Sequence, residues 1–112
     1  MEHPYTSDAT IDAAIEQIYT YDLLQNKVDA YRVLFELIEK MIRTKDWTAL
    51  NWFLGKIEIE MLSNQMIVGV LRCSSRANKH LPNWYWCREA ATTEFILRGV
   101  DYKHVLRGLY DI

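Results

Sequence analysis

Cysteine and histidine residues are the first candidates for chemistry in this sequence, because both residue types bind metals and take part in catalysis. Cys73, His80 and Cys87 follow one another at intervals of seven residues, and His104 lies farther along the chain. Four such side chains could surround a tetrahedral zinc ion. Zinc sites, however, usually take two ligands from a tight pair such as Cys-x-x-Cys, and the sequence contains no such pair. We therefore predict structural cysteines and no metal site.

A cysteine–histidine nucleophile is the second kind of chemistry to consider. It would pair Cys87 with His80 or His104, and a position near the start of a helix would lower the pKa of the Cys87 thiol. No recognisable third group or oxyanion hole accompanies such a pair. The sequence also lacks a phosphate-binding loop, a Gly-x-Gly-x-x-Gly run and a His-Glu-x-x-His motif. We expect a protein that is not an enzyme, with no cofactor and no small-molecule substrate.

Basic residues form a stripe in the segment 72–88. Arg72, Arg76 and Lys79 lie at i, i+4 and i+7, which places them on one face of a helix. His80 follows directly, and Arg88 lies about two helical turns later. This stripe is the most suggestive feature of the sequence, since such a face can contact acidic groups or phosphates.

Three consecutive aromatic residues, Trp84, Tyr85 and Trp86, follow the stripe. On a helix they spread over about 200°, so the three rings cannot all enter the same core. Two interpretations stay open: two rings fill the core while Tyr85 keeps its hydroxyl in water, or the rings join the basic stripe in a binding surface. The binding hypothesis comprises Arg72, Arg76, Lys79, His80, Trp84, Tyr85, Trp86 and Arg88.

A second candidate surface combines acidic residues with a tryptophan. Asp8, Asp12 and Glu16 fall at i, i+4 and i+8 and form an acidic ridge on the first predicted helix. Such a ridge is most often only solvated. Trp52 lies on a different side of its helix from Trp47, so a helix that is apolar on two sides is either central in the molecule or meets a partner.

Helical periodicity is strongest between residues 24 and 42. Asp22 and Gln25 resemble a capping box that would begin this helix. We expect its buried face to include Phe35, and the apolar stripe recurs at steps of four and three residues. The members of that stripe are Leu24, Val28, Tyr31, Phe35, Ile38 and Ile42, widened by Leu34, Leu37 and Met41.

Further helices are predicted before and after this one. The first spans about 8–20, capped by Ser7 or Thr10, and a third starts near Asp46. We place a break near Ser63, although one unbroken helix to residue 77 remains an alternative. A helix over 64–78 would bury Met66, Val70, Cys73 and Ala77.

The last part of the chain carries the clearest stop signals. Leu81-Pro82 must interrupt the helical pattern, and Asn83 would cap a helix over 84–98. Leu97-Arg98-Gly99-Val100 predicts its end, because glycine readily adopts the left-handed conformation. Asp101 would cap a short sixth helix, and Leu106-Arg107-Gly108-Leu109 repeats the stop signal.

Composition sets the fold class. The 112 residues are 50% hydrophobic and include only 4 Gly and 2 Pro, too few turn formers for many short strands. We predict an all-α fold: a compact single-domain bundle of five or six helices, with residues 1–7 as a flexible N-terminus. The sequence shows neither a transmembrane run nor a secretory signal, and two cysteines suit reduced thiols, so we expect a cytoplasmic protein.

Charge is close to balanced overall but uneven along the chain. The formal net charge is −2, yet residues 1–70 hold six Lys/Arg against eleven Asp/Glu, whereas residues 71–112 hold seven against four.

We therefore expect a small helical interaction module, an adaptor, inhibitor or self-associating regulator, that binds an acidic or apolar protein surface. The partner could be a second copy in a homodimer. The alternative is a nucleic-acid-associated protein that contacts phosphates through Arg72, Arg76, Lys79 and Arg88, which overall acidity disfavours. No membrane partner is expected.

Overall fold

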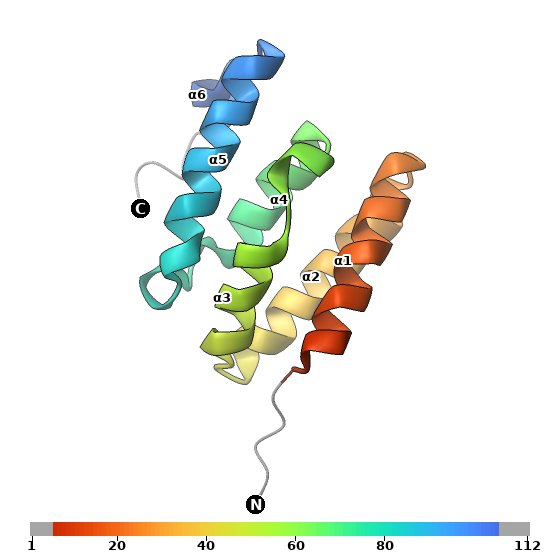
Figure 1. Ribbon diagram of the computed structural model, residues 1–112, viewed down its shortest axis with the longest axis vertical. Helices are drawn as coiled ribbons and strands as arrows, with labels where there is room; N and C mark the ends of the chain where they lie inside the picture. The colour runs from red at the N-terminus through yellow and green to blue at the C-terminus, as the bar shows by residue number, and fades with distance from the viewer. Residues whose placement is uncertain (1–5, 106–112) are drawn as a thin grey trace, which may run out of the picture.

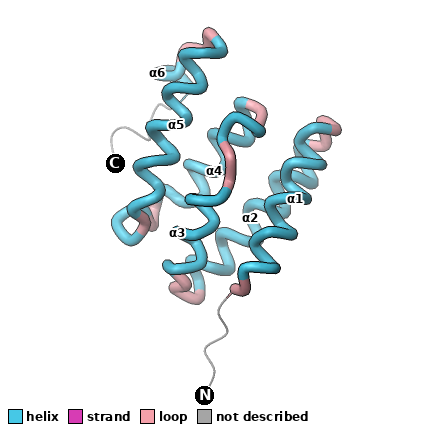
Figure 2. The backbone as a smooth tube through the Cα atoms, in the orientation of Figure 1, coloured by secondary structure: helices cyan, strands magenta, loops and turns pink. Residues whose placement is uncertain are grey.

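The computed structural model describes residues 6–105, and within them it confirms the all-α prediction. These residues form helices and two short 3-10 turns, with no strand (Figure 2). The helices are α1 (Asp8–Leu23), α2 (Lys27–Arg43), α3 (Trp47–Lys56), α4 (Asn64–Ser75), α5 (Pro82–Arg98) and α6 (Tyr102–Val105). The 3-10 turns are η1 (Ile59–Met61) and η2 (Asn78–His80).

The first five helices are arranged in two layers. Helices α1, α3 and α5 lie in front in Figure 1, and α2 and α4 lie behind them. Because successive helices run in opposite directions, α2 and α4 are parallel neighbours in the rear layer, and α3 and α5 are parallel neighbours in the front layer. One hydrophobic core lies between the layers and includes the fully buried indole of Trp84.

Short polar side chains begin four of the helices. Ser7 and Ser63 each accept a hydrogen bond from a backbone amide of the first turn, as predicted, and so do Asn26 and Asp46. Of the segment expected to be flexible, Thr6 is buried and donates its amide to Asp46 at 2.8 Å. Residues 1–5 lie outside the described part of the chain.

The predicted start of the second helix is wrong. Helix α1 continues to Leu23, the chain turns at Gln25 with φ of 60°, and α2 begins only after Asn26. Asp22 does not cap α2, because its carboxylate accepts hydrogen bonds from Lys27 Nζ and from Ser63, each at 2.7 Å. The carboxylate that was predicted to cap α2 is thus bound by Ser63, a residue far away in the sequence.

The buried stripe predicted for the second helix is confirmed for Leu34, Leu37, Ile38 and Met41, but it is wrong for Leu24, Val28, Tyr31 and Phe35. The side chains that enter the core are Ala30, Leu34, Leu37, Ile38 and Met41. Phe35 is 38% exposed, Tyr31 46% and Val28 78%. Helix α2 is apolar over a wide arc, and contacts with both α1 and α4 place the Leu34 side of that arc inside.

The break near Ser63 is confirmed, but α3 ends earlier than this break. After Lys56 the backbone becomes extended, and η1 then leads to the Ser63 cap. Met61, at the end of η1, is 56% exposed. Cys73, expected to be buried, is only partly so, whereas Met66, Val70 and Ala77 are buried.

Helix α5 begins and ends at proline and glycine. Pro82 occupies the first turn, where a missing amide hydrogen costs nothing. Asn83 is therefore not the N-cap, and it binds α3 instead. Gly99 ends the helix with φ of 72°, and the Val100 amide donates to Phe95 O at 2.9 Å, as the stop signal predicts. Asp101 caps α6, while the repeat of the signal at 106–109 lies outside the described residues.

Candidate interaction surfaces

The predicted basic stripe is only partly available for a partner. Arg76 forms an ion pair with Glu39 of α2, with Nη2 at 2.6 and 2.8 Å from the two carboxylate oxygens. Arg72 and Lys79 are exposed and form no ion pair with any residue in the described range. The stripe therefore presents two uncompensated charges and one that is matched within the chain.

The aromatic run is divided between core and surface. Trp84 is 1% exposed and donates its indole N–H to Leu71 O at 3.0 Å. The Arg88 guanidinium lies over two rings, 5.6 Å from the centre of Trp84 and 5.4 Å from that of Tyr85. Trp86 is 73% exposed. Trp84 thus belongs to the hydrophobic core, and the Arg88 guanidinium packs over its ring. The predicted binding set is corrected for these two residues.

The surroundings of the two cysteines disfavour a role as nucleophiles. Burial raises the pKa of the Cys87 thiol to about 11, so the lowered value predicted from its place on α5 is wrong. Cys87 donates to Leu54 O at 3.0 Å, and Cys73 donates to the Tyr31 hydroxyl at 3.5 Å. Both are free thiols. Within residues 6–105, no three His, Cys, Asp or Glu side chains gather where they could hold a metal.

The acidic ridge of α1 faces α3. Asp12 forms an ion pair with Lys56, whose ammonium also lies 5.6 Å from the centre of the Trp52 ring. Asp8 and Glu16 are exposed, and Trp52 is 46% exposed. The acidic residues and the tryptophan that were predicted to form a second surface therefore lie close together, where α1 contacts α3.

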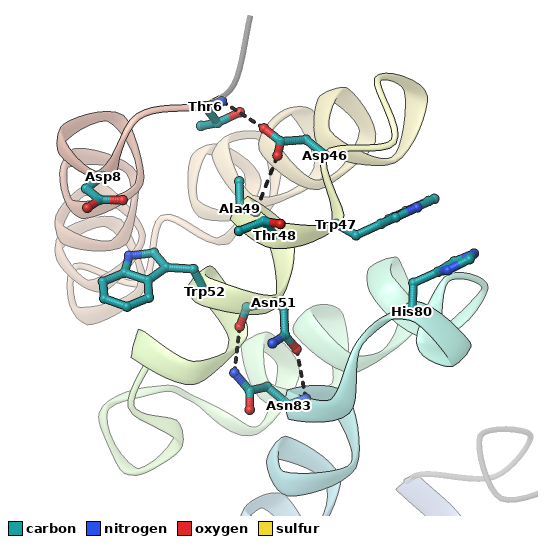
Figure 3. Close-up of a pocket in the computed structure, with 10 residues that line it drawn as sticks. All are labelled: Thr6, Asp8, Asp46, Trp47, Thr48, Ala49, Asn51, Trp52, His80 and Asn83. Carbon is teal, nitrogen blue, oxygen red and sulfur yellow. Dashed lines mark hydrogen bonds between the residues drawn. The ribbon is translucent and has the colours of Figure 1, made fainter. Parts of the chain in front are cut away.

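A hollow of about 610 Å³ opens at the start of α3 (Figure 3). Asp8 and Trp52 lie on one side of it, and Trp47 and His80 lie on the other. The Trp47 and His80 rings are stacked, with centres 4.3 Å apart and planes at 7°. The complete lining is Thr6, Asp8, Asp46, Trp47, Thr48, Ala49, Asn51, Trp52, His80 and Asn83.

A second hollow of about 330 Å³ adjoins the first at Asn83 and is lined by the C-terminal half of α3, by η1 and by α5. It shares Asn83 with the first and extends past Gly55 to Trp86, Glu58 and Glu60. Asn83 is fixed between the two, because its amide N–H and its Nδ2 donate to Asn51 Oδ1 and Asn51 O, both at 2.8 Å. We call the combined depression the α3 groove, with Asp8, Trp52, His80, Asn83, Trp86, Glu58 and Glu60 as its defining residues.

Gly55 is exposed on α3 beside Asn83 and belongs to the lining of the second hollow. A Cβ at this position would lie 2.7 Å from Asn83 Nδ2, so any larger residue would displace the amide that joins α3 to α5. The glycine thereby keeps the groove open and the two helices close together.

The α3 groove is acidic. Three exposed carboxylates line it, Asp8, Glu58 and Glu60, and neither hollow is lined by a Lys or Arg. Sequence reasoning selected Asp8, Trp52, His80 and Trp86, but assigned them to two separate surfaces. It missed Glu58, Glu60 and Asn83, since no local spacing shows that α1, α3, η1 and α5 meet at one depression.

No family model, curated protein or solved structure matches the chain, so the functional assignment depends on its own residues and geometry. Across the described range, no helix combines the length and apolar character required to cross a membrane.

Proposed function

We propose that this protein is a non-enzymatic interaction module that binds an apolar, basic segment of a partner protein in the α3 groove. The observation that carries the proposal is the exposure of two indoles, Trp52 and Trp86, along an acidic depression. Tryptophan residues contribute large binding energies when a partner covers them, and they are enriched at protein interfaces.

The chemistry of the groove favours a cationic partner over an acidic one. Three exposed carboxylates line it, and the Trp52 ring already makes a cation–π contact with the Lys56 ammonium. An arginine or lysine of a partner could make the same cation–π contact and pair with Asp8, Glu58 or Glu60. The basic stripe led us to expect an acidic partner, whereas the groove favours a basic one. The difference arises because the two exposed indoles lie beside carboxylates and not beside the stripe.

Pre-organisation supports this surface further. Asn83 and Asn51 are hydrogen-bonded to each other, Asp46 is held by Thr6, and the Trp47 ring is stacked on His80. Binding to side chains that are already ordered costs less conformational entropy.

The proposal also covers activity and location. Burial raises the pKa of both the Cys73 and the Cys87 thiol, which argues against a cysteine nucleophile and is consistent with the proposed non-enzymatic role. Two free thiols are typical of proteins in a reducing compartment, which supports the cytoplasm as the site of action.

The test uses peptides of about 12 residues selected from a random phage-displayed library against the folded protein. We expect the selected peptides to be rich in Arg or Lys together with aromatic or aliphatic residues. Trp52→Ala and Trp86→Ala should each weaken their binding on the order of tenfold, as central indoles do at interfaces. Fluorescence anisotropy of labelled peptides gives the Kd.

The matched control is Leu97→Ala, which removes a side chain that is 76% exposed on α5 but lies outside the groove. Its Kd should equal that of the unmodified protein. Selection of acidic peptides, or equal losses in the control and the tryptophan variants, would contradict the proposal.

A further inference from the structure

A second exposed apolar row lies on the rear layer, away from the α3 groove. Val28, Tyr31 and Phe35 follow one another on α2 at steps of four and three residues and are exposed by 78%, 46% and 38%. Tyr31 and Phe35 stack with ring centres 6.1 Å apart. A hollow of about 420 Å³ runs beside Val28 and Tyr31 toward Gln65 and Met66 of α4.

Helix α4 holds this row in place. The tyrosine ring lies beside Gly69, where an added Cβ would be 3.4 Å from Tyr31 Cε2, in ordinary van der Waals contact. The Cys73 thiol donates to the Tyr31 hydroxyl at 3.5 Å one turn later. The ring is therefore oriented by α4 on one side while its other side remains accessible.

The α4 side of the row is positively charged. Residues 61–88 contain no Asp or Glu, and Arg72 is exposed on α4 without an ion pair to any described residue. The contact with the Cys73 thiol raises the pKa of the Tyr31 hydroxyl, and the nearby Arg72 charge acts in the opposite direction. Arg76 follows one turn later, and its charge is matched by Glu39. We call Val28, Tyr31, Phe35 and Arg72 together the α2–α4 ridge.

We propose that the α2–α4 ridge binds an acidic amphipathic helix of a partner protein, as a second site beyond the α3 groove. Steps of four and three residues are the repeat by which one helix contacts another along a seam. Leu or Ile side chains of the partner would cover Val28 and Phe35, and its Glu or Asp would pair with Arg72. The two layers of the molecule would then select partners of opposite charge.

Three synthetic helical peptides of equal length serve as probes. The first has Leu at steps of four and three residues with Glu on both flanks, the second has Lys in place of Glu, and the third has Ser in place of Leu. We expect the Leu/Glu peptide to bind most tightly, with on the order of tenfold weaker binding for each of the other two. Its Kd should rise with salt concentration.

Two variants locate the site. Arg72→Glu and Phe35→Ala should each weaken binding of the Leu/Glu peptide on the order of tenfold. Arg43→Glu makes the same change in net charge at an exposed arginine in the last turn of α2, and it should leave the Kd unchanged. Trp52→Ala should also leave it unchanged, which separates failure of this proposal from failure of the α3 groove.

Other outcomes identify a different occupant and overturn the proposal. Equal binding of the Glu and Lys peptides would show that charge does not select the partner. Binding of single-stranded DNA that is abolished by Arg72→Glu, without binding of the Leu/Glu peptide, would assign the ridge to nucleic acid. A dimer in sedimentation velocity that Phe35→Ala converts to monomer would assign it to a second copy of the chain.

Discussion

Asp22 shows how a single buried carboxylate can organise the connection between distant helices. Its side chain is 3% exposed and accepts hydrogen bonds from Lys27 Nζ, from the Ser63 amide and from the Ser63 hydroxyl. Ser63 in turn caps α4. Burial alone would raise the pKa of Asp22, but the hydrogen bonds outweigh burial and hold this pKa below its usual value. The end of α1 is thereby tied to the start of α4.

Replacement of Asp22 by Asn should lower the free energy of unfolding near neutral pH by about 2 kcal/mol, because hydrogen bonds to a buried charge are lost. A pKa below that of the unfolded chain means that the charge stabilises the fold fully above the unfolded value and loses its effect as pH falls through the folded value. The deficit of the variant should therefore shrink as the pH falls below the ordinary carboxyl pKa of 3.8 and through the lower pKa of the folded protein.

Urea unfolding at a series of pH values measures this difference. Glu16→Gln serves as the control, since Glu16 is an exposed carboxylate of the same helix without an ion pair in the described structure. A deficit at Asp22→Asn that is independent of pH would mean that the carboxylate charge contributes nothing to stability.

At the scale of elements, α2 shows that an apolar stripe and a buried face are different things. The helix presents two overlapping stripes, one through Leu34, Leu37 and Ile38 and the other through Val28, Tyr31 and Phe35. Both fit helical periodicity. Only the first is buried, because α1 and α4 contact α2 on that side.

Leu34→Ala should cost about 2–5 kcal/mol of unfolding free energy, because it opens a cavity at a side chain that is fully buried. Phe35→Ala should cost about 1 kcal/mol, mainly through the lost stack on Tyr31. Chemical denaturation of the two variants provides the comparison. A larger loss at Phe35 than at Leu34 would show that α2 is rotated relative to the structure described above.

At the scale of the whole molecule, polar contacts join segments that are far apart in the sequence and that belong to both layers. Thr6 before α1 binds Asp46 before α3, Asp22 binds Ser63, and Asn51 binds Asn83 of α5. These contacts surround one continuous hydrophobic cluster. Helices in such an arrangement lose their neighbours together when any one of them detaches.

We therefore expect a single cooperative unfolding transition. Tryptophan fluorescence, to which the buried Trp84 contributes, and circular dichroism, which reports all helices, should give the same urea midpoint. Two separated midpoints, with part of the helical signal lost before the fluorescence changes, would show that the α1–α2 hairpin unfolds independently.

Local chemistry determined much of the architecture from sequence alone. Ser7, Ser63 and Gly99 act on backbone groups within a few residues, so their roles as helix ends could be predicted and were confirmed. Low glycine and proline content and helical periodicity likewise sufficed for the all-α fold, since both express properties of short segments.

Tertiary structure alone decided which residues are exposed and which of them lie side by side. Periodicity cannot distinguish the Leu34 face of α2 from the Phe35 face, and only the neighbouring helices select between them. Asn83 looked like a cap because its competing partner, Asn51, lies 32 positions away in the sequence. The α3 groove and the α2–α4 ridge combine side chains from different helices, so their composition depends on distances that no single segment encodes.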